Sequence, residues 1–152
     1  MQFNRALFLD LDGTIIITKS GKNFPTDIDD WMFIPKVLDN IKFYSDQGYI
    51  ICIVTNQGGI ELGYITHENI DNKLKDITKE IEHRIGTYVN TVYCPYMSGY
   101  HRKPNPGMAY KMALELELDL KNSIMVGDSE SDKTFAENAN IGNFCYITEF
   151  IK

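Results

Sequence analysis

Apolar residues along the chain gather in five short runs, and amphipathic segments separate these runs. Each run is five to seven residues long, as is typical of strands buried on both faces of a sheet. The runs cover residues 6–10, 49–55, 90–94, 123–128 and 143–147. Because strand patterns alternate with helix patterns, we expect right-handed βαβ units. The predicted fold is therefore α/β: a three-layer, Rossmann-like parallel sheet with helices on both faces.

Helical spacing of apolar residues marks four segments between the runs. Pro35 favours the start of the first helix, which should end at Gly48. Thr66 is a suitable N-cap for the second helix, and Gly86 is a suitable end. The third helix should open at Asn105, and the fourth should run from about residue 131 to 138.

Length and composition narrow the class of protein. A chain of 152 residues with 43% hydrophobic residues can bury a substantial core, so we expect one domain over residues 1–152. The net charge of −6 argues against broad, sequence-independent nucleic-acid binding but leaves room for a small basic patch. No Pro/Gly/Ser-rich linker and no internal repeat suggests a boundary.

Three cysteines are widely spaced, at Cys52, Cys94 and Cys145, and form no Cys-x-x-Cys pair. This pattern favours reduced thiols in a cytoplasmic protein. No stretch resembles a signal peptide or a membrane span, so we predict no membrane association. Oligomeric state is left open by the sequence.

Two aspartates end the first apolar run, in the stretch LFLDLDGT at residues 7–14. Residues two apart on a strand face the same side, so Asp10 and Asp12 can converge, and Gly13 allows a sharp turn. A calcium loop is excluded because its glycine would be sixth, whereas here it is fourth. A plain aspartate turn is the simplest alternative. Ligands of parallel sheets, however, bind at this edge.

Three further stretches place polar residues beside other predicted elements. VTNQ ends the second strand with Thr55 and Asn56, whose hydroxyl and N–H groups suit a phosphate oxygen. HRKPNPGM places Arg102 and Lys103 just before the third helix, where cations can neutralise phosphate. MVGDSESD ends the fourth strand with Asp128. Each stretch alone has an ordinary explanation as a loop, a surface or a helix start, but their combination favours a phosphate site.

With these four stretches the chain resembles the haloacid dehalogenase (HAD) superfamily of phosphotransferases over residues 5–147. The resemblance implies that Asp10 attacks phosphorus and that Asp12 is the general acid and base. It also implies Mg²⁺ held by Asp10, Asp128 and the Asp12 backbone carbonyl, with Thr55 and Lys103 holding the phosphate. The chemistry agrees, because an anionic nucleophile approaching a phosphate needs Mg²⁺ and a lysine to neutralise charge.

The substrate is indicated first by the segment after the aspartates. Only about twenty residues separate DLDGT from the helix expected at Pro35, which leaves no room for a cap domain. Residues 18–31, TKSGKNFPTDIDDW, resemble the DNA 3′-phosphatase domains of polynucleotide kinase/phosphatases. Lys19 and Lys22 could extend a basic patch from the predicted phosphate site, and Phe24 or Trp31 could stack on a base. We therefore expect a nucleic-acid 3′-phosphate end as substrate, as in DNA repair.

A second resemblance points to smaller substrates. YCPYMSGYHRKPNPGM is similar to the heptose bisphosphate and histidinol phosphate phosphatases, which hold a structural zinc in this loop. Here Cys94 and His101 stand at two of the ligand positions, but Tyr96 and Gly99 stand at the others. Because structural zinc needs four ligands, we expect none. A small-molecule phosphatase is the alternative function, and a non-catalytic phosphate-binding module is a third possibility.

Overall fold

The computed structural model describes residues 2–152 and contains a five-stranded parallel sheet in the order β5-β4-β1-β6-β7. The strands are β1 (Ala6–Leu9), β4 (Ile50–Asn56), β5 (Val89–Cys94), β6 (Ile124–Gly127) and β7 (Asn143–Tyr146). Each lies within one residue, at either end, of the range predicted from the sequence. The predicted α/β fold is thereby confirmed.

The central position of β1 decides where a site can form. The chain runs from β1 outward through β4 to β5, and then returns to β6 and β7 on the other side of β1. Leu9, the last residue of β1, pairs with Ile53 in β4 and with Val126 in β6. The segments that follow these three strands therefore leave the sheet side by side, at a switch point where ligands of such sheets bind.

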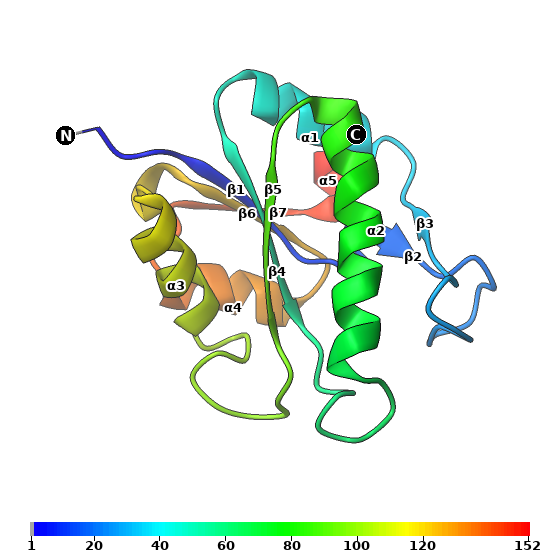
Figure 1. Ribbon diagram of the computed structural model, residues 1–152. Coiled ribbons are helices and arrows are strands. Elements are labelled where there is room, and N and C mark those ends of the chain that lie inside the picture. The colour runs from blue at the N-terminus through cyan, green and yellow to red at the C-terminus, as the bar shows by residue number, and fades with distance from the viewer. Residues whose placement is uncertain (1) are drawn as a thin grey trace.

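Helices cover both faces of the sheet (Figure 1). Side chains of β1 alternate between two separate apolar clusters, Leu7 and Leu9 in one, Ala6 and Phe8 in the other. The first cluster includes α1 (Val37–Asp46), α2 (His67–Ile85) and the short α5 (Ile147–Phe150), and the second includes α3 (Gly107–Leu116) and α4 (Glu130–Asn138). Burial of strands on both faces explains their continuous apolar runs.

Helix ends follow the sequence signals in part. Thr66 caps α2 by accepting a hydrogen bond from the Asn69 N–H at 3.1 Å, and Gly86 ends this helix with a φ of +78°. The first helix starts at Val37 and not at Pro35. Asn105 does not cap α3, because its side-chain amide donates instead to the Gly99 carbonyl at 2.8 Å.

A two-stranded antiparallel sheet of β2 (Ile16–Ile17) and β3 (Met32–Phe33) was not predicted. It carries the loop of residues 18–31, which the buried Asp30 organises. The Asp30 carboxylate accepts hydrogen bonds from the Ser20 N–H at 2.9 Å, the Ser20 hydroxyl at 2.7 Å and the Thr26 N–H at 2.9 Å. These donors, Thr26 first, hold the pKa of Asp30 well below its usual range. Phe24 is 82% exposed on this loop.

The remaining connections are short. Apart from the 3₁₀ turn at Leu120–Asn122, residues 2–152 contain no further helix or strand, and no connection among them carries a cap domain. Within the same residues, no helix has both the length and the apolar character needed to cross a membrane. All three cysteines are free, and burial raises the pKa of the Cys52 thiol to about 12.

Candidate active site

Asp10 directly follows β1 and lies almost fully buried at the carboxyl edge of the sheet. Its backbone N–H donates to the Val126 carbonyl of β6 at 3.1 Å, so its position is fixed by the sheet. The chain then turns at Gly13, which has a φ of +80°. A Cβ at this glycine would collide with the Asp128 carboxylate. The turn therefore brings the Asp128 carboxylate next to the segment that carries Asp10.

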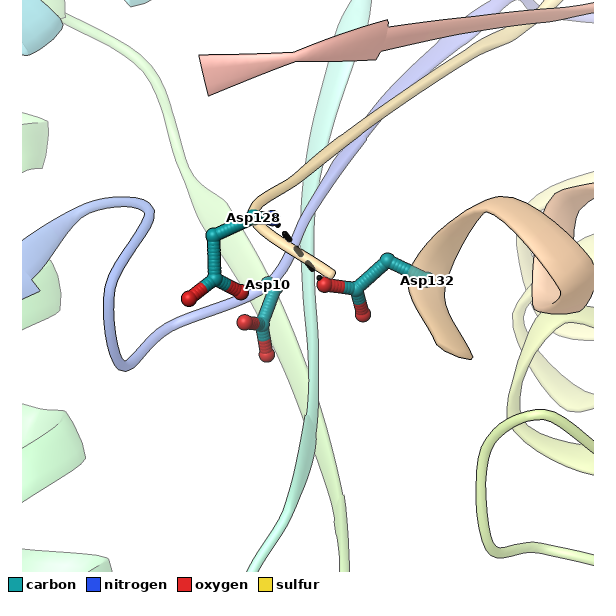
Figure 2. Close-up of side chains that lie close together, drawn as sticks. All are labelled: Asp10, Asp128 and Asp132. Atoms are coloured by element: carbon teal, nitrogen blue, oxygen red, sulfur yellow. Dashed lines mark hydrogen bonds between the residues drawn. The ribbon is translucent and has the colours of Figure 1, made fainter. Parts of the chain in front are cut away.

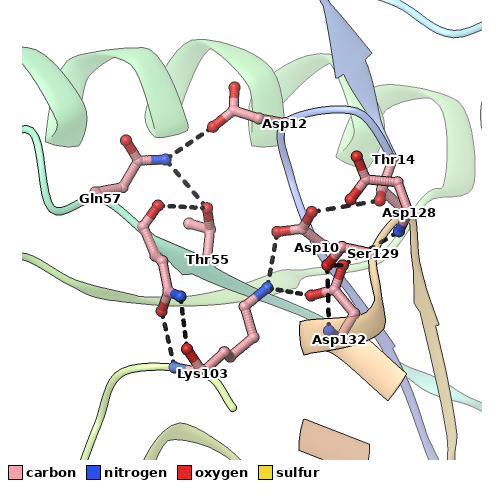
Figure 3. A network of polar contacts seen from close by, with 10 residues as sticks. Asp10, Asp12, Thr14, Thr55, Gln57, Lys103, Asp128, Ser129 and Asp132 are labelled. Atoms are coloured by element: carbon pink, nitrogen blue, oxygen red, sulfur yellow. Dashed lines mark hydrogen bonds and ion pairs between the residues drawn. The ribbon is translucent and has the colours of Figure 1, made fainter. Parts of the chain in front are cut away.

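Lys103 is the cation of the site, and it is 4% exposed. Its Nζ lies 2.8 Å from Asp10 Oδ1 and 2.8 Å from Asp132 Oδ1 (Figure 3). A buried ammonium group between two carboxylates is held by charge on both sides, which fixes a long and otherwise mobile side chain. One positive charge therefore pairs with two carboxylates, Asp10 and Asp132, and the Asp128 carboxylate lies close to both of them.

Asp132 connects the loop after β6 to this lysine. Its Oδ2 accepts hydrogen bonds from the Asp128 N–H at 3.1 Å and from the Ser129 hydroxyl at 3.0 Å. The Ser129 hydroxyl in turn accepts from the Asp132 N–H at 3.2 Å and caps α4. Asp132 was not among the residues predicted to form the site. Its spacing of four residues from Asp128, at the start of a helix, was the available signal.

The carboxyl end of β4 and the residue after it supply further polar groups. Thr55 is the second-to-last residue of β4 and is buried, and the Gln57 amide Nε2 lies 3.1 Å from Thr55 Oγ1. The same nitrogen donates to Asp12 Oδ2 at 3.1 Å. Asp12 is exposed and lies apart from the buried carboxylates (Figure 3). The Gln57 side chain thus links Thr55 to Asp12, and the catalytic and binding roles expected for these residues stay predictions.

The side chains of Asn56 and Arg102 form hydrogen bonds with backbone groups of the loop after β5. The Asn56 side chain donates to the Lys103 carbonyl at 3.0 Å and accepts from the Lys103 N–H at 2.9 Å, which ties the backbone of the lysine to β4. Arg102 Nη1 donates to the Tyr96 carbonyl at 2.9 Å. These contacts let both residues position loops beside the site, and the phosphate binding expected of them stays a prediction.

Two loops next to the site brace one another. The Met97 N–H donates to Glu61 Oε2 at 2.6 Å, and the Glu61 N–H donates to the Pro95 carbonyl at 3.2 Å. The loop after β5 contains the positions where the resemblance places zinc ligands. At those positions the Tyr96 and Gly99 carbonyls accept hydrogen bonds from Arg102 and Asn105, and the His101 side chain is exposed.

Burial and crowding of like charges perturb the acids of the site. Burial raises the pKa of Asp10 from 3.8 to about 7; Lys103 opposes this increase, and Asp132 and Asp128 add to it. Burial likewise raises the pKa of Asp128. Burial alone would lower the pKa of Lys103, but the adjacent Asp10 and Asp132 carboxylates outweigh it and the pKa is raised. The site therefore carries excess negative charge that an added cation would relieve.

The carboxylates fit a divalent cation that prefers hard oxygen ligands. Oxygens of Asp10, Asp128 and Asp132 lie within 4.8 Å of one another (Figure 2). Both oxygens of Asp132 already accept hydrogen bonds, whereas Asp128 and Asp10 Oδ2 are less committed. Within residues 2–152, no hydrogen-bond donor contacts the Asp12 carbonyl oxygen. Asp10, Asp128 and that carbonyl are therefore the groups available to Mg²⁺, which retains several waters.

This arrangement has the parts of a phosphatase that uses an aspartate nucleophile: a buried carboxylate, a lysine beside it and an acidic pair for a cation. A family model described as Polynucleotide kinase 3 phosphatase matches residues 5–150. The chain therefore belongs to this family of HAD-like phosphatases and is itself a phosphatase.

Two relatives of similar sequence are heptose bisphosphate phosphatases. The chain is 34% identical over 151 residues to the D-glycero-alpha-D-manno-heptose-1,7-bisphosphate 7-phosphatase of Campylobacter jejuni, covering 95% of this chain and 83% of the relative. It is 31% identical over 147 residues to the D-glycero-beta-D-manno-heptose-1,7-bisphosphate 7-phosphatase of Helicobacter pylori, covering 94% and 83%. These relatives support the small-molecule alternative better than the expected nucleic-acid end.

Solved structures share the fold. A HAD-like phosphatase structure from Mesorhizobium loti aligns with a TM-score of 0.80 at 29% identity, over 93% of this chain and 70% of that one. The D,D-heptose 1,7-bisphosphate phosphatase of B. bronchiseptica, which was solved with magnesium and phosphate, aligns with a TM-score of 0.79 at 24% identity, over 91% and 78%. At that identity the second alignment supports the fold alone.

Proposed function

We propose that this chain is a Mg²⁺-dependent phosphomonoesterase that removes a phosphate from a small phosphorylated sugar, through an aspartyl phosphate on Asp10. The observation that carries the proposal is the buried Lys103 between Asp10 and Asp132, with Asp128 beside them at the switch point of the sheet. Such a cluster of like charges is costly unless a cation and a phosphoryl group use it.

The reaction divides between two aspartates. In the first step an Asp10 oxygen forms a bond to phosphorus, the bond from phosphorus to the leaving oxygen breaks, and Asp12 donates a proton to that oxygen. In the second step Asp12 accepts a proton from water as the water oxygen bonds to phosphorus and the bond to Asp10 breaks. Bound Mg²⁺ would supply charge neutralisation between Asp10, Asp128 and the phosphate. Asp12 is suited to its role because it is exposed and lies two residues after the nucleophile in the chain.

Lys103 and Thr55 bind the phosphoryl group in this proposal. The ammonium group of Lys103 already touches Asp10, so it stands where negative charge accumulates as the nucleophile attacks. The Thr55 hydroxyl faces the same rim from β4. Asn56 keeps the backbone of Lys103 in register with β4 and acts through that lysine.

The sugar assignment rests on the named relatives and on the open site. Within residues 2–152 no cap domain encloses the aspartates, so the organic part of the substrate meets loops alone. The braced loops beside the site expose Tyr64, Tyr96 and Tyr100. Exposed aromatic faces with hydroxyl groups suit a polyhydroxylated ring.

A panel of phosphate esters tests the proposal. Phosphate release would be measured with Mg²⁺ and with EDTA, for both anomers of D-glycero-D-manno-heptose 1,7-bisphosphate, histidinol phosphate, a 3′-phosphorylated oligonucleotide and p-nitrophenyl phosphate. We expect Mg²⁺-dependent turnover in which kcat/KM for a heptose bisphosphate exceeds that for the aryl ester by about 100-fold, since remote binding energy raises rate. Asp10→Asn should be inactive, and Asp46→Asn, a distant surface control, fully active. Equal kcat/KM for every ester would refute the sugar assignment.

A polynucleotide 3′-phosphate end is the second candidate, favoured by the loop of residues 18–31. This loop is held rigid by Asp30, exposes Phe24, and carries Lys19 and Lys22 on an otherwise acidic protein. The same panel decides between the candidates. The highest kcat/KM for the oligonucleotide, lost in Lys22→Glu and Phe24→Ala, would favour the second candidate over the first.

A further inference from the structure

Gln57 contacts two residues of the site, although the reaction proposed above assigns it no role. Its backbone N–H donates to the Cys94 carbonyl of β5 at 2.7 Å, so the residue is anchored to the sheet. Its side-chain Nε2 then reaches two groups of the site, Asp12 Oδ2 at 3.1 Å and Thr55 Oγ1 at 3.1 Å (Figure 3). A single amide nitrogen thus links the acid–base residue to the phosphate-binding hydroxyl.

The direction of these hydrogen bonds constrains two protons. An amide NH₂ group has two protons and accepts none, so both Asp12 Oδ2 and Thr55 Oγ1 act as acceptors toward it. When Asp12 is protonated, its proton must therefore lie on Oδ1, the oxygen that Gln57 does not contact. The Thr55 hydroxyl keeps its own proton for donation. Its one acceptor among residues 2–152 is the Asn56 carbonyl at 3.5 Å, a long contact that a phosphoryl oxygen can readily replace.

We propose that Gln57 is a positioning residue that sets which oxygen of Asp12 transfers the proton and turns the Thr55 hydroxyl toward the phosphate. This inference rests on the proposed function, because it assigns Asp12 as general acid and base. Asp12 Oδ1 gives its proton to the leaving oxygen as the bond to phosphorus breaks. The same oxygen accepts the proton of water as the aspartyl phosphate is hydrolysed. Gln57 exchanges no proton and forms no bond to the substrate.

A comparison of two aryl phosphates separates this role from a structural one. Phenyl phosphate has a poor leaving group that needs the proton of Asp12, whereas 2,4-dinitrophenyl phosphate has a good leaving group that does not. Gln57→Leu should lower kcat/KM for phenyl phosphate about 10- to 100-fold, part of the usual contribution of acid–base catalysis. The loss for 2,4-dinitrophenyl phosphate should be at least about tenfold smaller. Loss of Thr55 orientation alone would lower both values by the same factor.

The second step gives an independent measurement. Hydrolysis of the aspartyl phosphate needs Asp12 as base for every substrate, so Gln57→Leu should accumulate phosphorylated protein in rapid-quench intact-mass spectra. Gln57→Glu keeps the shape but lacks the donor and should behave like Gln57→Leu. Gln47→Leu is the matched control, since Gln47 precedes β4 at the end of the strand opposite the site and donates to the Phe43 carbonyl. The kinetics of this variant should be those of the wild type.

Two results would overturn the role of Gln57. One is an equal loss on both aryl phosphates with no accumulation of phosphorylated protein. The other is a full additional loss from Gln57→Leu in an Asp12→Asn background, where coupled residues should show little further effect. Failure of the proposed function gives a different pattern, because wild-type protein would then release no phosphate with Mg²⁺ or Asp10→Asn would remain active.

Discussion

Replacing Asp10 by asparagine should abolish turnover and, at the same time, make the metal-free protein more stable at neutral pH. The reason is that Asp10 is one of three carboxyl groups that lie close together with a single buried lysine as their counter-charge. Asparagine keeps the shape of the side chain and removes one negative charge. A residue that serves function at a cost in stability behaves in this way.

The size of this gain in the free energy of unfolding follows from the pKa of Asp10. The Asp10 carboxyl has a pKa of about 7 in the folded chain and an ordinary value of 3.8. Below pH 3.8 the group is protonated in both states and has no effect. Between pH 3.8 and 7 the unfolded chain ionises first, so the free energy of unfolding falls as pH rises. The full difference, reached above pH 7, is about 4 kcal/mol, because one unit of pKa corresponds to about 1.4 kcal/mol.

Urea unfolding in EDTA at pH 8 and at pH 4 measures this effect. We expect Asp10→Asn to raise the free energy of unfolding by about 2–4 kcal/mol at pH 8, and by far less at pH 4. Asp12→Asn is the matched control, because Asp12 is an exposed carboxylate on the same loop, and it should change stability little. Added Mg²⁺ should stabilise the wild type more than Asp10→Asn. An Asp10→Asn protein that is no more stable than the wild type at pH 8 without metal would refute the reasoning.

Three other substitutions probe the same network and the loop beside it. Lys103→Met leaves Asp10 and Asp132 buried without a cation, so urea unfolding at pH 8 should show a loss of about 3–5 kcal/mol that shrinks in acid; an unchanged midpoint would contradict the buried ion pairs. Asp132→Asn should lower kcat about 10- to 100-fold while the fold persists by circular dichroism, since Lys103 loses one of its two partners; full activity would remove Asp132 from the site. Asp30→Asn should speed limited proteolysis within residues 18–31 and raise KM, and cleavage at the wild-type rate would show that other contacts hold the loop.

The sheet and α2 could be predicted from the sequence because their signals are local and consistent. Five continuous apolar runs gave strands accurate to a residue, and Thr66 and Gly86 bounded α2. The pair β2–β3 has two residues in each strand, too few for any periodic pattern to indicate. Asparagine is a residue type that often caps helices, but tertiary packing gives the Asn105 amide the Gly99 carbonyl as its acceptor.

The residues at the strand ends could be predicted as site residues for the same reason. The residues that contact them from other loops could not. Asp10, Thr55 and Asp128 are the last residues of three predicted strands, so their placement at one edge follows from the parallel order of the sheet. The contacts of Asp132 with Lys103 and of Gln57 with Asp12 join segments far apart in sequence. Such contacts depend on how loops pack, which no local pattern encodes. The prediction of the substrate depended on two loops, one that resembles DNA 3′-phosphatases and one that resembles small-molecule phosphatases. The heptose bisphosphate phosphatases among the relatives favour a sugar phosphate.

The turn at Gly13 has a consequence for how this site can change. The space that a side chain at residue 13 would fill is occupied by the Asp128 carboxylate, and the left-handed backbone there already disfavours other residues. Residues 13 and 128 are therefore not independent positions for protein engineering. A library that varies residue 13 while keeping Asp128 should yield active variants with glycine alone. Alanine at residue 13 should be tolerated only together with a smaller residue at 128, which removes a carboxylate from the proposed cation site.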